Sequence, residues 1–299
     1  MILRAATIGS LILLGACAPA PESHSKAFLG AVLIDGTGGP PLSNSIVLTA
    51  ADRIRSAGPR SSIPIPAEAD KIDGAGKCIV PTPVDACDRA DPPGAIHATT
   101  PEEGRRQVAD LAARKPSVIH LAQVPPDVGE AVLEAARAVE IPVLAHISTV
   151  AEVRRLVDHG AAGFIGMIAD TEDLDPTFLA HLRTLRVGFA PAVVTAGAGL
   201  EVAKRNTLRL FQAGVPIGAA SRGGDLQREI ELLVEAGLPP LDAIVAATRN
   251  SAMLIREADR GTIAAEKRAD LLVLSANPGE DIHNLRKVAL RLNAGEWAK

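Results

Sequence analysis

Apolar runs alternate with longer mixed stretches through the middle of the chain. The runs predict six strands, and the mixed stretches predict helices between and after them. Strands that alternate with helices form a parallel sheet with crossover connections, so the pattern predicts an α/β fold. The expected strands are Cys78–Val84, Ser117–Ala122, Ile141–Ile147, Ala162–Met167, Val187–Ala192 and Val215–Ala220. The expected helices are Pro101–Arg114, Val128–Val139, Thr149–His159, Asp175–Leu185, Leu200–Ala213, Gly224–Ala236 and Leu241–Ala247.

Residues at the ends of these stretches support the helix assignment. The segment Thr100–Glu103 is typical of a helix start, with proline at the first position and acidic residues in the first turn. Gly160 and Gly214 stand where C-terminal caps are expected. Nearer the N-terminus, the apolar run Ala31–Ile34 is followed by the turn signal Asp35–Pro40. This part of the chain is therefore predicted to form short strands.

The composition narrows the class of function. The chain has 299 residues, 47% of them hydrophobic, which is enough for one large domain or a large and a small one. Its net charge is -4, with 31 basic and 35 acidic residues interspersed, and 2% of the residues are aromatic. No basic stripe is present to neutralise phosphates, and few rings are present on which bases could stack. The composition therefore predicts no nucleic-acid partner.

The first residues have the features of a targeting signal. A positively charged start precedes the apolar run Ala5–Leu14, which is too short to span a bilayer, and Leu14–Cys17 resembles a bacterial lipobox. We expect residues 1–17 to be a lipoprotein signal peptide, Cys17 to be lipidated, and residues 18–26 to form a tether. The alternative is an ordinary cleaved signal with an incidental cysteine. Lipidation predicts a protein anchored to a membrane of the bacterial cell envelope, on the periplasmic side or at the outer membrane.

Segments at both ends and in the middle resemble a known family. Ile34–Pro41 is similar to the N-terminal hairpin of the metal-dependent amidohydrolase superfamily. Arg260–Leu274 and Asn293–Trp297 are similar to its return and final strands. Ile79–Arg89 resembles its first barrel strand, which in that family runs into an Asp-Ala-His-x-His motif. The resemblance covers nearly the whole mature chain and is greatest to the branch of imidazolonepropionases and dipeptidases.

The resemblance implies a TIM-like (β/α) barrel at residues 78–260, beside a small β-sandwich that both termini build from residues 27–77 and 261–299. In the family, two further βα units precede the fourth strand, but here Asp91–Gly94 leads almost directly to the helix at Pro101. We therefore expect a barrel that lacks about two βα units. Such a barrel is open or contracted, or a second copy of the chain covers its edges in a homo-oligomer.

Most functional residues of the family are replaced in this chain. Cys87 and Arg89 stand in place of the two motif histidines, Gly166 in place of a ligand histidine, and Arg222 in place of the catalytic aspartate. His146 alone matches a family metal ligand. Arginine has no lone pair for a metal, and two cations beside the site repel one. These replacements predict no bound cofactor and a catalytically inactive family member that acts in binding or as a scaffold.

The alternative is a metal-dependent hydrolase with a rebuilt site. His120, where the family often places a metal-bridging lysine, and His146 stand at the ends of adjacent predicted strands. Cys87, Asp88 or Asp91 would add a third ligand, and two histidines with a cysteine or an aspartate suit zinc. This site predicts hydrolysis of non-peptide or dipeptide C–N bonds. A catalytic Cys87 thiol paired with a histidine is a weaker alternative, because no nucleophile-turn motif surrounds it.

A further hypothesis concerns the two arginines. Arg89 and Arg222 at one barrel mouth could clamp a small carboxylate ligand. The alternative is that each pairs with a neighbouring aspartate, namely Asp88, Asp91 or Asp225. The other chemistry-bearing residues are expected to be a buried, hydrophobic Cys78 and the surface histidines His97, His159, His181 and His283.

Overall fold

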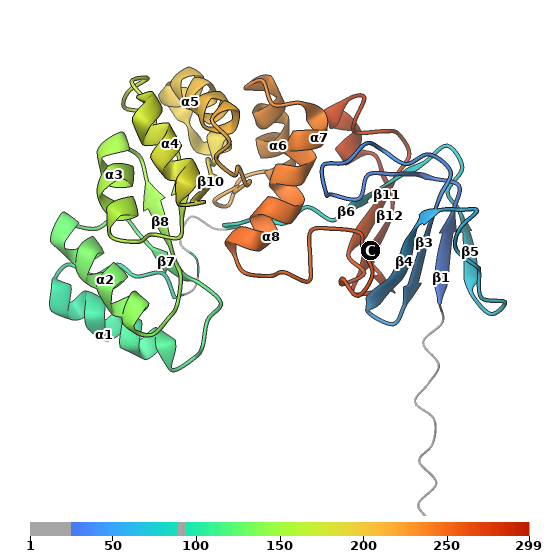
Figure 1. The fold of residues 1–299 in the computed structure, drawn as a ribbon, viewed down its shortest axis with the longest axis horizontal. Helices are drawn as coiled ribbons and strands as arrows, with labels where there is room; N and C mark the ends of the chain where they lie inside the picture. Colours follow the sequence, from blue (N-terminus) through green and yellow to red (C-terminus); the bar gives the residue numbers. More distant parts are fainter. Residues whose placement is uncertain (1–24, 89–91, 93, 299) are drawn as a thin grey trace, which may run out of the picture.

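The structure is a computed structural model that describes residues 25–88, 92 and 94–298. Cys17, Arg89 and Asp91, for which the sequence carries predictions, lie outside the described residues. Figure 1 shows an α/β part, coloured green to orange, beside a part made of strands from the two ends of the chain, coloured blue and red. No helix of the described residues is long and apolar enough to cross a membrane.

Four parallel strands form the sheet of the α/β part, in the order β10-β9-β8-β7. Single parallel bridges extend it on both sides, from Leu121 to Ile96 and from Phe189 to Ile217. The predicted α/β fold is confirmed, but the described residues form no closed barrel, so the TIM-like barrel is not. The strands are β7 (Ile119–Leu121), β8 (Val143–Ile147), β9 (Gly163–Gly166) and β10 (Gly188–Ala190).

The first strand predicted for the barrel, Cys78–Val84, joins a different sheet. Its regular part, β6 (Cys78–Pro81), pairs antiparallel with β11 (Leu271–Leu274) and parallel with β2 (Val32–Leu33). Pro81 and Pro83 have no N–H group with which to continue the ladder. The chain therefore leaves this sheet after β6 and enters the α/β part without forming a strand there.

The last predicted strand of the α/β part, Val215–Ala220, also differs from expectation. It contributes the bridge at Ile217 and isolated bonds, such as the one in which Ala86 N donates to Ala219 O over 2.9 Å. A hydroxyl from a helix takes a place that a neighbouring strand would fill, because Ala219 N donates to Ser251 Oγ over 2.9 Å. The segment is therefore held in place by side chains and single bonds rather than by a ladder.

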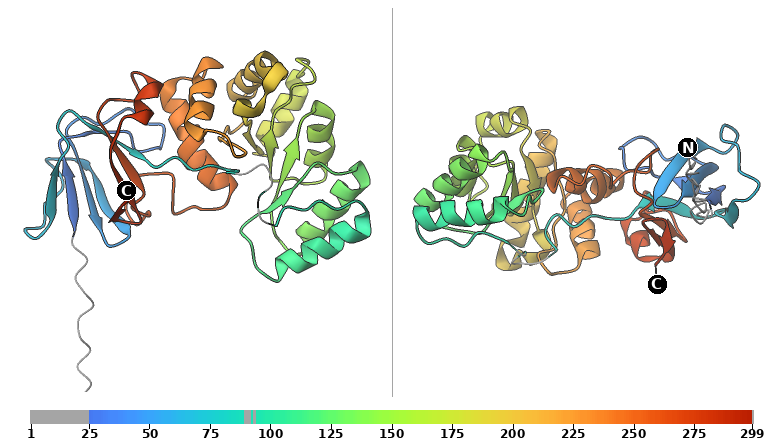
Figure 2. Two further views of the ribbon diagram at one scale, coloured as in Figure 1. Left: turned by 180° about the vertical axis from the view of Figure 1, so that it is seen from behind. Right: turned by 90° about the horizontal axis from the view of Figure 1, so that it is seen from below.

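Helices cover the outer face of the parallel sheet, as both views in Figure 2 show. Capping follows from the sequence, because Thr100 and Thr149 accept the N–H groups of Glu103 and Glu152 at the starts of α1 and α3. The helices begin and end within two residues of the predicted positions for most elements. They are α1 (Pro101–Ala112), α2 (Pro126–Ala138), α3 (Val150–Asp158), α4 (Pro176–Thr184), α5 (Leu200–Gln212), α6 (Leu226–Glu235), α7 (Pro240–Val245) and α8 (Ser251–Leu254).

The remaining strands form two sheets around a second core. Their orders are β4-β3-β1-β5 and β13-β12-β11-β6-β2, so one sheet combines strands from both ends of the chain. Phe28 and Val47 of the first sheet share a buried cluster with Ile79 and Leu271 of the second. The strands not yet given are β1 (Lys26–Leu29), β3 (Ser45–Ala50), β4 (Arg53–Pro59), β5 (Asp70–Asp73), β12 (Val288–Asn293) and β13 (Glu296–Trp297).

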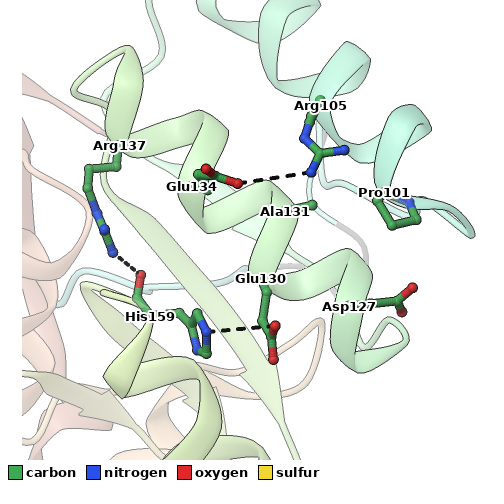
Figure 3. Close-up of a pocket in the computed structure, with 8 residues that line it drawn as sticks. All are labelled: Pro101, Arg105, Asp127, Glu130, Ala131, Glu134, Arg137 and His159. Atoms are coloured by element: carbon green, nitrogen blue, oxygen red, sulfur yellow. Dashed lines mark hydrogen bonds and ion pairs between the residues drawn. The ribbon is translucent and has the colours of Figure 1, made fainter.

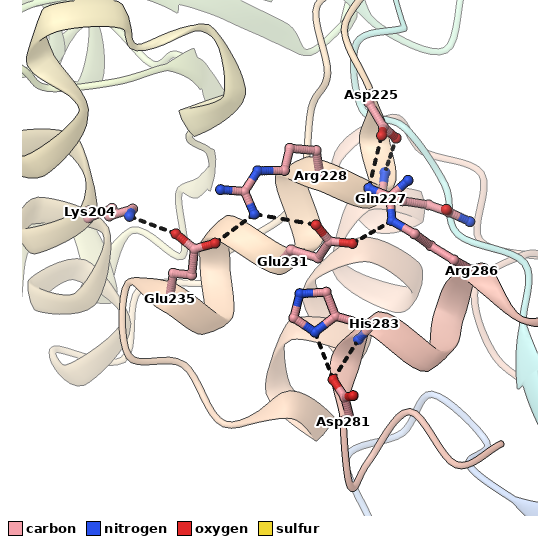
Figure 4. Close-up of polar contacts among 9 residues, drawn as sticks. All are labelled: Lys204, Asp225, Gln227, Arg228, Glu231, Glu235, Asp281, His283 and Arg286. Atoms are coloured by element: carbon pink, nitrogen blue, oxygen red, sulfur yellow. Dashed lines mark hydrogen bonds and ion pairs between the residues drawn. The ribbon is translucent and has the colours of Figure 1, made fainter.

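A charged network fastens the C-terminal segment to the α/β part, as Figure 4 shows. Arg286, at the end of the short helix η4 (Ile282–Arg286), donates to Glu231 of α6 over 2.6 Å and to Asp225 over 2.9 Å. Arg228 contacts Glu231 from the other side, at 3.3 Å. Glu231 is buried, so these bonds hold a carboxylate that would otherwise lack solvation.

Candidate metal centre

Strand alternation places the two candidate histidines on the same face of the parallel sheet. His120 of β7 pairs with Leu144 of β8, and His146 follows Leu144 by two residues, so all three point to the face opposite the main core, on which Leu254 of α8 also packs. Ala145, which lies between Leu144 and His146 on β8, points the other way, into the main core under the helices. The alternation of the sequence therefore fixes which side of the sheet the imidazoles occupy.

Cys87 reaches the same face from the segment that follows β6. Asp85 Oδ1 accepts the N–H of Cys87 over 3.0 Å and the N–H of Ser221 over 2.9 Å. The carbonyl of Cys87 in turn accepts the N–H of Arg222 over 2.7 Å. Asp85, the residue that matches the family motif, thus ties the Cys87 segment to the segment after Ile217 and positions the thiol.

Cys87, His120 and His146 come together as one cluster. One potential ligand atom from each lies within 4.8 Å of the others, and Cys87 Sγ lies 3.9 Å from His146 Nε2. The two imidazole rings have centroids 5.8 Å apart and planes inclined by 70°. Cys87 and His146 are buried and His120 is half-buried. A thiolate and two imidazoles at such spacing are a donor set that a single metal ion can take.

Two properties of His120 fit a metal ligand. Its Nδ1 atom is buried and has no hydrogen-bond partner in the structure, which is uncommon for a buried polar atom. Burial lowers the pKa of the imidazole, an effect that the negative charge of Asp88 partly opposes. The neutral form, which carries a lone pair for a metal, is therefore favoured. The residues present thus fit a soft or borderline divalent ion, with zinc as the example the sequence suggested.

A pocket of about 290 Å³ opens beside the cluster and is lined by Cys87 and His120. Three carboxylates, Asp85, Asp88 and Glu257, also line it, and none of the described lining residues is basic. The sequence had suggested that arginines would make this mouth positive. Instead, the described part of the pocket is acidic, which favours a cation.

Arg222 forms no ion pair with Asp225, while the expected clamp with Arg89 and a pair with Asp91 involve residues outside the described ones. It has a left-handed backbone with φ of 50°, and its Nε atom is buried without a partner. Asp225, proposed as a partner, caps α6 and pairs with Arg286 at 2.9 Å (Figure 4). The predicted pairing of Arg222 with Asp225 is therefore wrong. The arginine is also absent from the described lining of the pocket beside Cys87.

Gly166, at the position of a family ligand histidine, has a structural reason to lack a side chain. Its φ is 109°, a conformation that residues with a Cβ rarely adopt. A Cβ built there would lie 2.3 Å from the carbonyl oxygen of Ile147. With this backbone a side chain at Gly166 is strained, so a metal site in this chain uses other positions.

Cys78 lies outside the cluster. It is buried in the main core, and its Sγ lies 4.0 Å from Asn277 Oδ1. Burial, together with the charge of Glu280, raises the pKa of the thiol to about 12. A thiol held protonated in this way is a poor ligand and a poor nucleophile.

Two of the predicted surface histidines line or flank pockets made of paired charges. His159 contacts Glu130 at 3.7 Å, and His181 contacts Asp158 at 3.3 Å. The pocket of about 450 Å³ over α2 that contains His159 is drawn in Figure 3. Its acidic and basic side chains largely pair with one another, so it lacks a group directed at a ligand.

A buried carboxyl group that was not predicted from the sequence lies near the strand ends. Glu229 of α6 is fully buried, and its Oε2 accepts the N–H of Val194 over 2.6 Å while Oε1 has no partner. Burial raises the pKa of Glu229 to about 8, against opposing hydrogen bonds from Val194 and Val193, and the charge of Asp85 adds to the rise. The carboxyl group is thus close enough to Asp85 to sense its charge.

A periodicity argument could have identified this residue. Residues three or four apart share a helix face, so Glu229 lies on the same face as Leu226 and Leu233. Leu233 is fully buried, and the face packs toward the strand ends. An acidic residue at an apolar position of an amphipathic helix indicates a buried carboxyl group.

Comparison with models of protein families gave no match, and comparison with curated proteins gave none either. Solved structures do share the fold. A protein described as a prolidase from Bifidobacterium longum is 22% identical with a TM-score of 0.77, and the match covers 93% of this chain and 95% of that one. Ochratoxinase from A. niger is 16% identical with a TM-score of 0.79, covering 92% and 96%. A Xaa-Pro dipeptidase is 15% identical with a TM-score of 0.76, covering 92% and 100%.

These matches, with a further one to an amidohydrolase, show that the chain has the fold of these solved proteins, as the resemblance of its sequence motifs implied. At identities of 22% and below, the similarity concerns the fold. What the site does must be argued from its own residues.

Proposed function

With an amidohydrolase fold and a cluster of three metal-binding side chains as the premise, we propose that the protein is a metal-dependent hydrolase of C–N bonds. The observation that supports this is the convergence of Cys87, His120 and His146, whose ligand atoms lie within 4.8 Å of one another. Three protein ligands that leave one position open are typical of catalytic zinc sites, whereas structural sites are closed by four. The site is a rebuilt one, because two of its members replace family residues.

The side chains of this chain have distinct roles in the proposal. Cys87, His120 and His146 hold the metal, which when bound provides Lewis acidity toward a carbonyl group and lowers the pKa of water. Asp85 positions Cys87 through the N–H bond of 3.0 Å. Asp88, an exposed carboxylate in the lining of the pocket, is the candidate general base.

The pocket limits the substrate to a small molecule. Its volume of about 290 Å³ is at the lower end of the range for ligand sites. Solved proteins of the same fold include a Xaa-Pro dipeptidase and an ochratoxinase. We therefore propose a small amide or a dipeptide as the substrate class.

Metal content tests the site directly. The mature chain, purified without added chelator, is expected to hold about one zinc, iron or manganese ion by elemental analysis. The variants His120→Ala, His146→Ala and Cys87→Ser should each lose most of it. His181→Ala, which removes an exposed histidine far along the chain, serves as the control and should keep it. A chain that folds normally and holds no metal would refute the proposal.

Turnover tests the reaction. Metal-loaded protein is expected to hydrolyse members of a panel of Xaa-Pro dipeptides and N-acyl amino acids. Asp88→Asn should lower kcat by about 100-fold or more if this carboxylate is the general base, while the metal content stays unchanged. Full metal occupancy without turnover on the panel would limit the protein to metal binding.

A second candidate function is binding of a small carboxylate without catalysis. Arg222 favours it, because its Nε atom is a buried donor without a partner and the residue stands where the family has its catalytic aspartate. Thermal unfolding in the presence of acetate or free proline distinguishes the two functions. Stabilisation that Arg222→Gln abolishes, in a protein without turnover, would support the binding function.

We also propose that the protein is anchored to the bacterial cell envelope through a lipid on Cys17. The support is the lipobox-like sequence Leu14–Cys17 after a short apolar run. Metabolic labelling with a fatty-acid analogue should mark the wild-type protein and not Cys17→Ala. Labelling that persists in the variant would contradict the assignment.

A further inference from the structure

A pocket at the start of strands β9 and β10 lies away from the metal centre. It has a volume of about 750 Å³ and is lined by residues that precede or begin strands, including Ala162, Gly188 and Pro216. In a parallel sheet, the N-terminal ends of all strands lie on one side and their C-terminal ends lie on the opposite side. This pocket shares no lining residue with the pocket beside Cys87, although Ile255 and Glu257 of that pocket flank Arg256 in the chain.

Four arginines surround this pocket, and its described lining contains no acidic residue. They come from three places in the chain: the end of α4 and the loop after it, the π-helical turn of chain η3 (Ala246–Asn250), and the residue pair after α8. We call it the arginine pocket, after Arg183, Arg186, Arg249 and Arg256.

The guanidinium groups of the arginine pocket have no carboxylate partners among the described residues. The ion pairs found within 4.0 Å among these residues involve other arginines, such as Arg154 with Asp175, or a lysine or histidine, such as Lys204 with Glu235. The chain has 35 acidic residues against 31 basic ones, so carboxylates are abundant elsewhere. Four like charges around one cavity repel each other, and a bound anion removes that repulsion.

Two of the arginines are positioned by contacts that leave the pocket open. Arg249 Nη1 donates to the carbonyl of Thr37 over 2.5 Å, and its Nε donates to Asn250 over 3.4 Å. The methylene stem of Arg183 packs beside Gly214, where a Cβ would lie 3.2 Å from Arg183 Cδ. Arg186 and Arg256 are exposed. The cationic groups are thus spread around the cavity and are not drawn into internal ion pairs.

The base of the pocket is apolar. Leu254 packs against Gly163 and Gly188 at the start of the sheet, and Met253 beside it is 61% exposed. A ligand that fills this space meets an apolar surface below and cationic groups around it. Such a site suits an organic molecule with anionic groups better than a bare inorganic ion.

We propose that the arginine pocket binds a small polyanion, a molecule that carries at least two negative charges in phosphate groups. Arginine presents paired N–H donors that match phosphate oxygens. Four arginines provide more positive charge than a single carboxylate needs. The phosphate belongs to a soluble small molecule or to a lipid headgroup. The proposal does not rest on the hydrolase activity, because the two pockets share no lining residue.

Calorimetric titration of the full chain with pyrophosphate, at constant ionic strength, tests the proposal. The double variant Arg186→Gln/Arg256→Gln should raise the Kd by about tenfold or more, since two charge-assisted contacts are lost. The matched control Arg114→Gln/Arg291→Gln removes the same charge from exposed residues that do not line the pocket, and should change the Kd by less than about twofold. Unfolding midpoints measured without pyrophosphate show whether both variants remain folded.

Two further arms complete the experiment. Titration of chelator-treated His146→Ala protein should give the wild-type Kd, which shows that the anion does not bind at the metal centre. Sedimentation with phosphatidylcholine vesicles, with and without phosphatidylglycerol, tells whether a lipid headgroup is the source of the phosphate. Binding to either probe that depends on Arg186 and Arg256 supports the proposal. Absence of saturable binding to both, or equal weakening in the control variant, overturns it.

Discussion

Gly166 illustrates how the backbone limits the chemistry of single positions. The sequence resemblance implied a ligand histidine at this position, but φ of 109° and the nearby carbonyl of Ile147 leave no room for a side chain here. His120 instead occupies the same sheet face as His146, because His120 pairs with Leu144 and His146 follows Leu144 by two residues. At the scale of residues, Gly166 cannot supply a metal ligand, and His120 on another strand is a candidate ligand.

Replacement of Gly166 with alanine should destabilise the protein strongly. The Cβ would approach Ile147 O to 2.3 Å and the backbone would be strained, so we expect a loss of about 3 kcal/mol or more in the free energy of unfolding. Gly197 is the control, because its φ is 52° and nothing lies within 4 Å of its Cβ position. Urea unfolding should give a loss of about 1 kcal/mol for Gly197→Ala. Equal losses in the two variants would contradict the steric argument.

Glu229 should make stability depend on pH. Its pKa is raised by burial from 4.5 to about 8, so the folded state favours the protonated form. The stabilisation is complete below pH 4.5 and is lost as pH rises toward 8, by at most about 1.4 kcal/mol per pH unit. Glu229→Gln should remove this dependence. Urea unfolding of both proteins between pH 5 and about 8 measures it, and parallel pH profiles would show that the carboxyl is ionised or solvated.

At the scale of elements, the starts of the parallel strands pack on one side chain from α8. Cβ atoms added at Gly163, Gly188 and Gly218 would each lie within 2.8 Å of Leu254. Glycine at these positions allows Leu254 to approach the backbone and to cover the end of the sheet. The fit explains why small residues recur in segments where strands favour large ones.

Leu254→Ala should leave a cavity that three backbones border. We expect a loss of about 2–4 kcal/mol in the free energy of unfolding, as for other large-to-small changes in packed sites. Its neighbour Met253 is 61% exposed and provides a matched control, with an expected change within about 0.5 kcal/mol. Chemical denaturation of both variants checks the difference. A small effect for Leu254→Ala would mean that the sheet start can collapse onto the gap.

At the scale of the whole molecule, the metal cluster joins separate parts of the chain. Cys87 belongs to the segment that enters from β6, while His120 and His146 belong to two strands of the parallel sheet. An ion bound by all three would cross-link the open side of the α/β part. Such binding stabilises the native state by mass action, because the unfolded chain offers no preformed site.

Zinc should therefore raise the unfolding temperature. With free zinc at about 100 times the Kd, stabilisation of about 2.7 kcal/mol is expected, which corresponds to roughly 5–10 °C for a chain of this size. Differential scanning calorimetry with zinc and with a chelator measures the shift. His146→Ala should abolish it and His181→Ala should keep it. A shift that survives in His146→Ala would place the zinc elsewhere.

Local pattern was sufficient to predict most helices and the four strands β7 to β10, because amphipathic spacing and caps such as Thr100 and Thr149 act within a few residues. It was not sufficient for the first and last strands predicted for the barrel, Cys78–Val84 and Val215–Ala220. Cys78–Pro81 is as apolar as a barrel strand, yet its partners β11 and β2 come from distant segments. Which edge a strand joins depends on contacts between residues far apart in the chain, which periodicity does not encode.

The sequence by itself determined the α/β order, the superfamily likeness of the fold, and the residues able to bind a metal, because these depend on spacing and side-chain type. Only the tertiary structure decided that Cys87, His120 and His146 share one cluster, that Arg222 lies outside the pocket lining, and that arginines gather at the far edge of the sheet. Distances between segments, burial and unpaired charge are properties of the packed chain, and they exist only after its distant parts have come together.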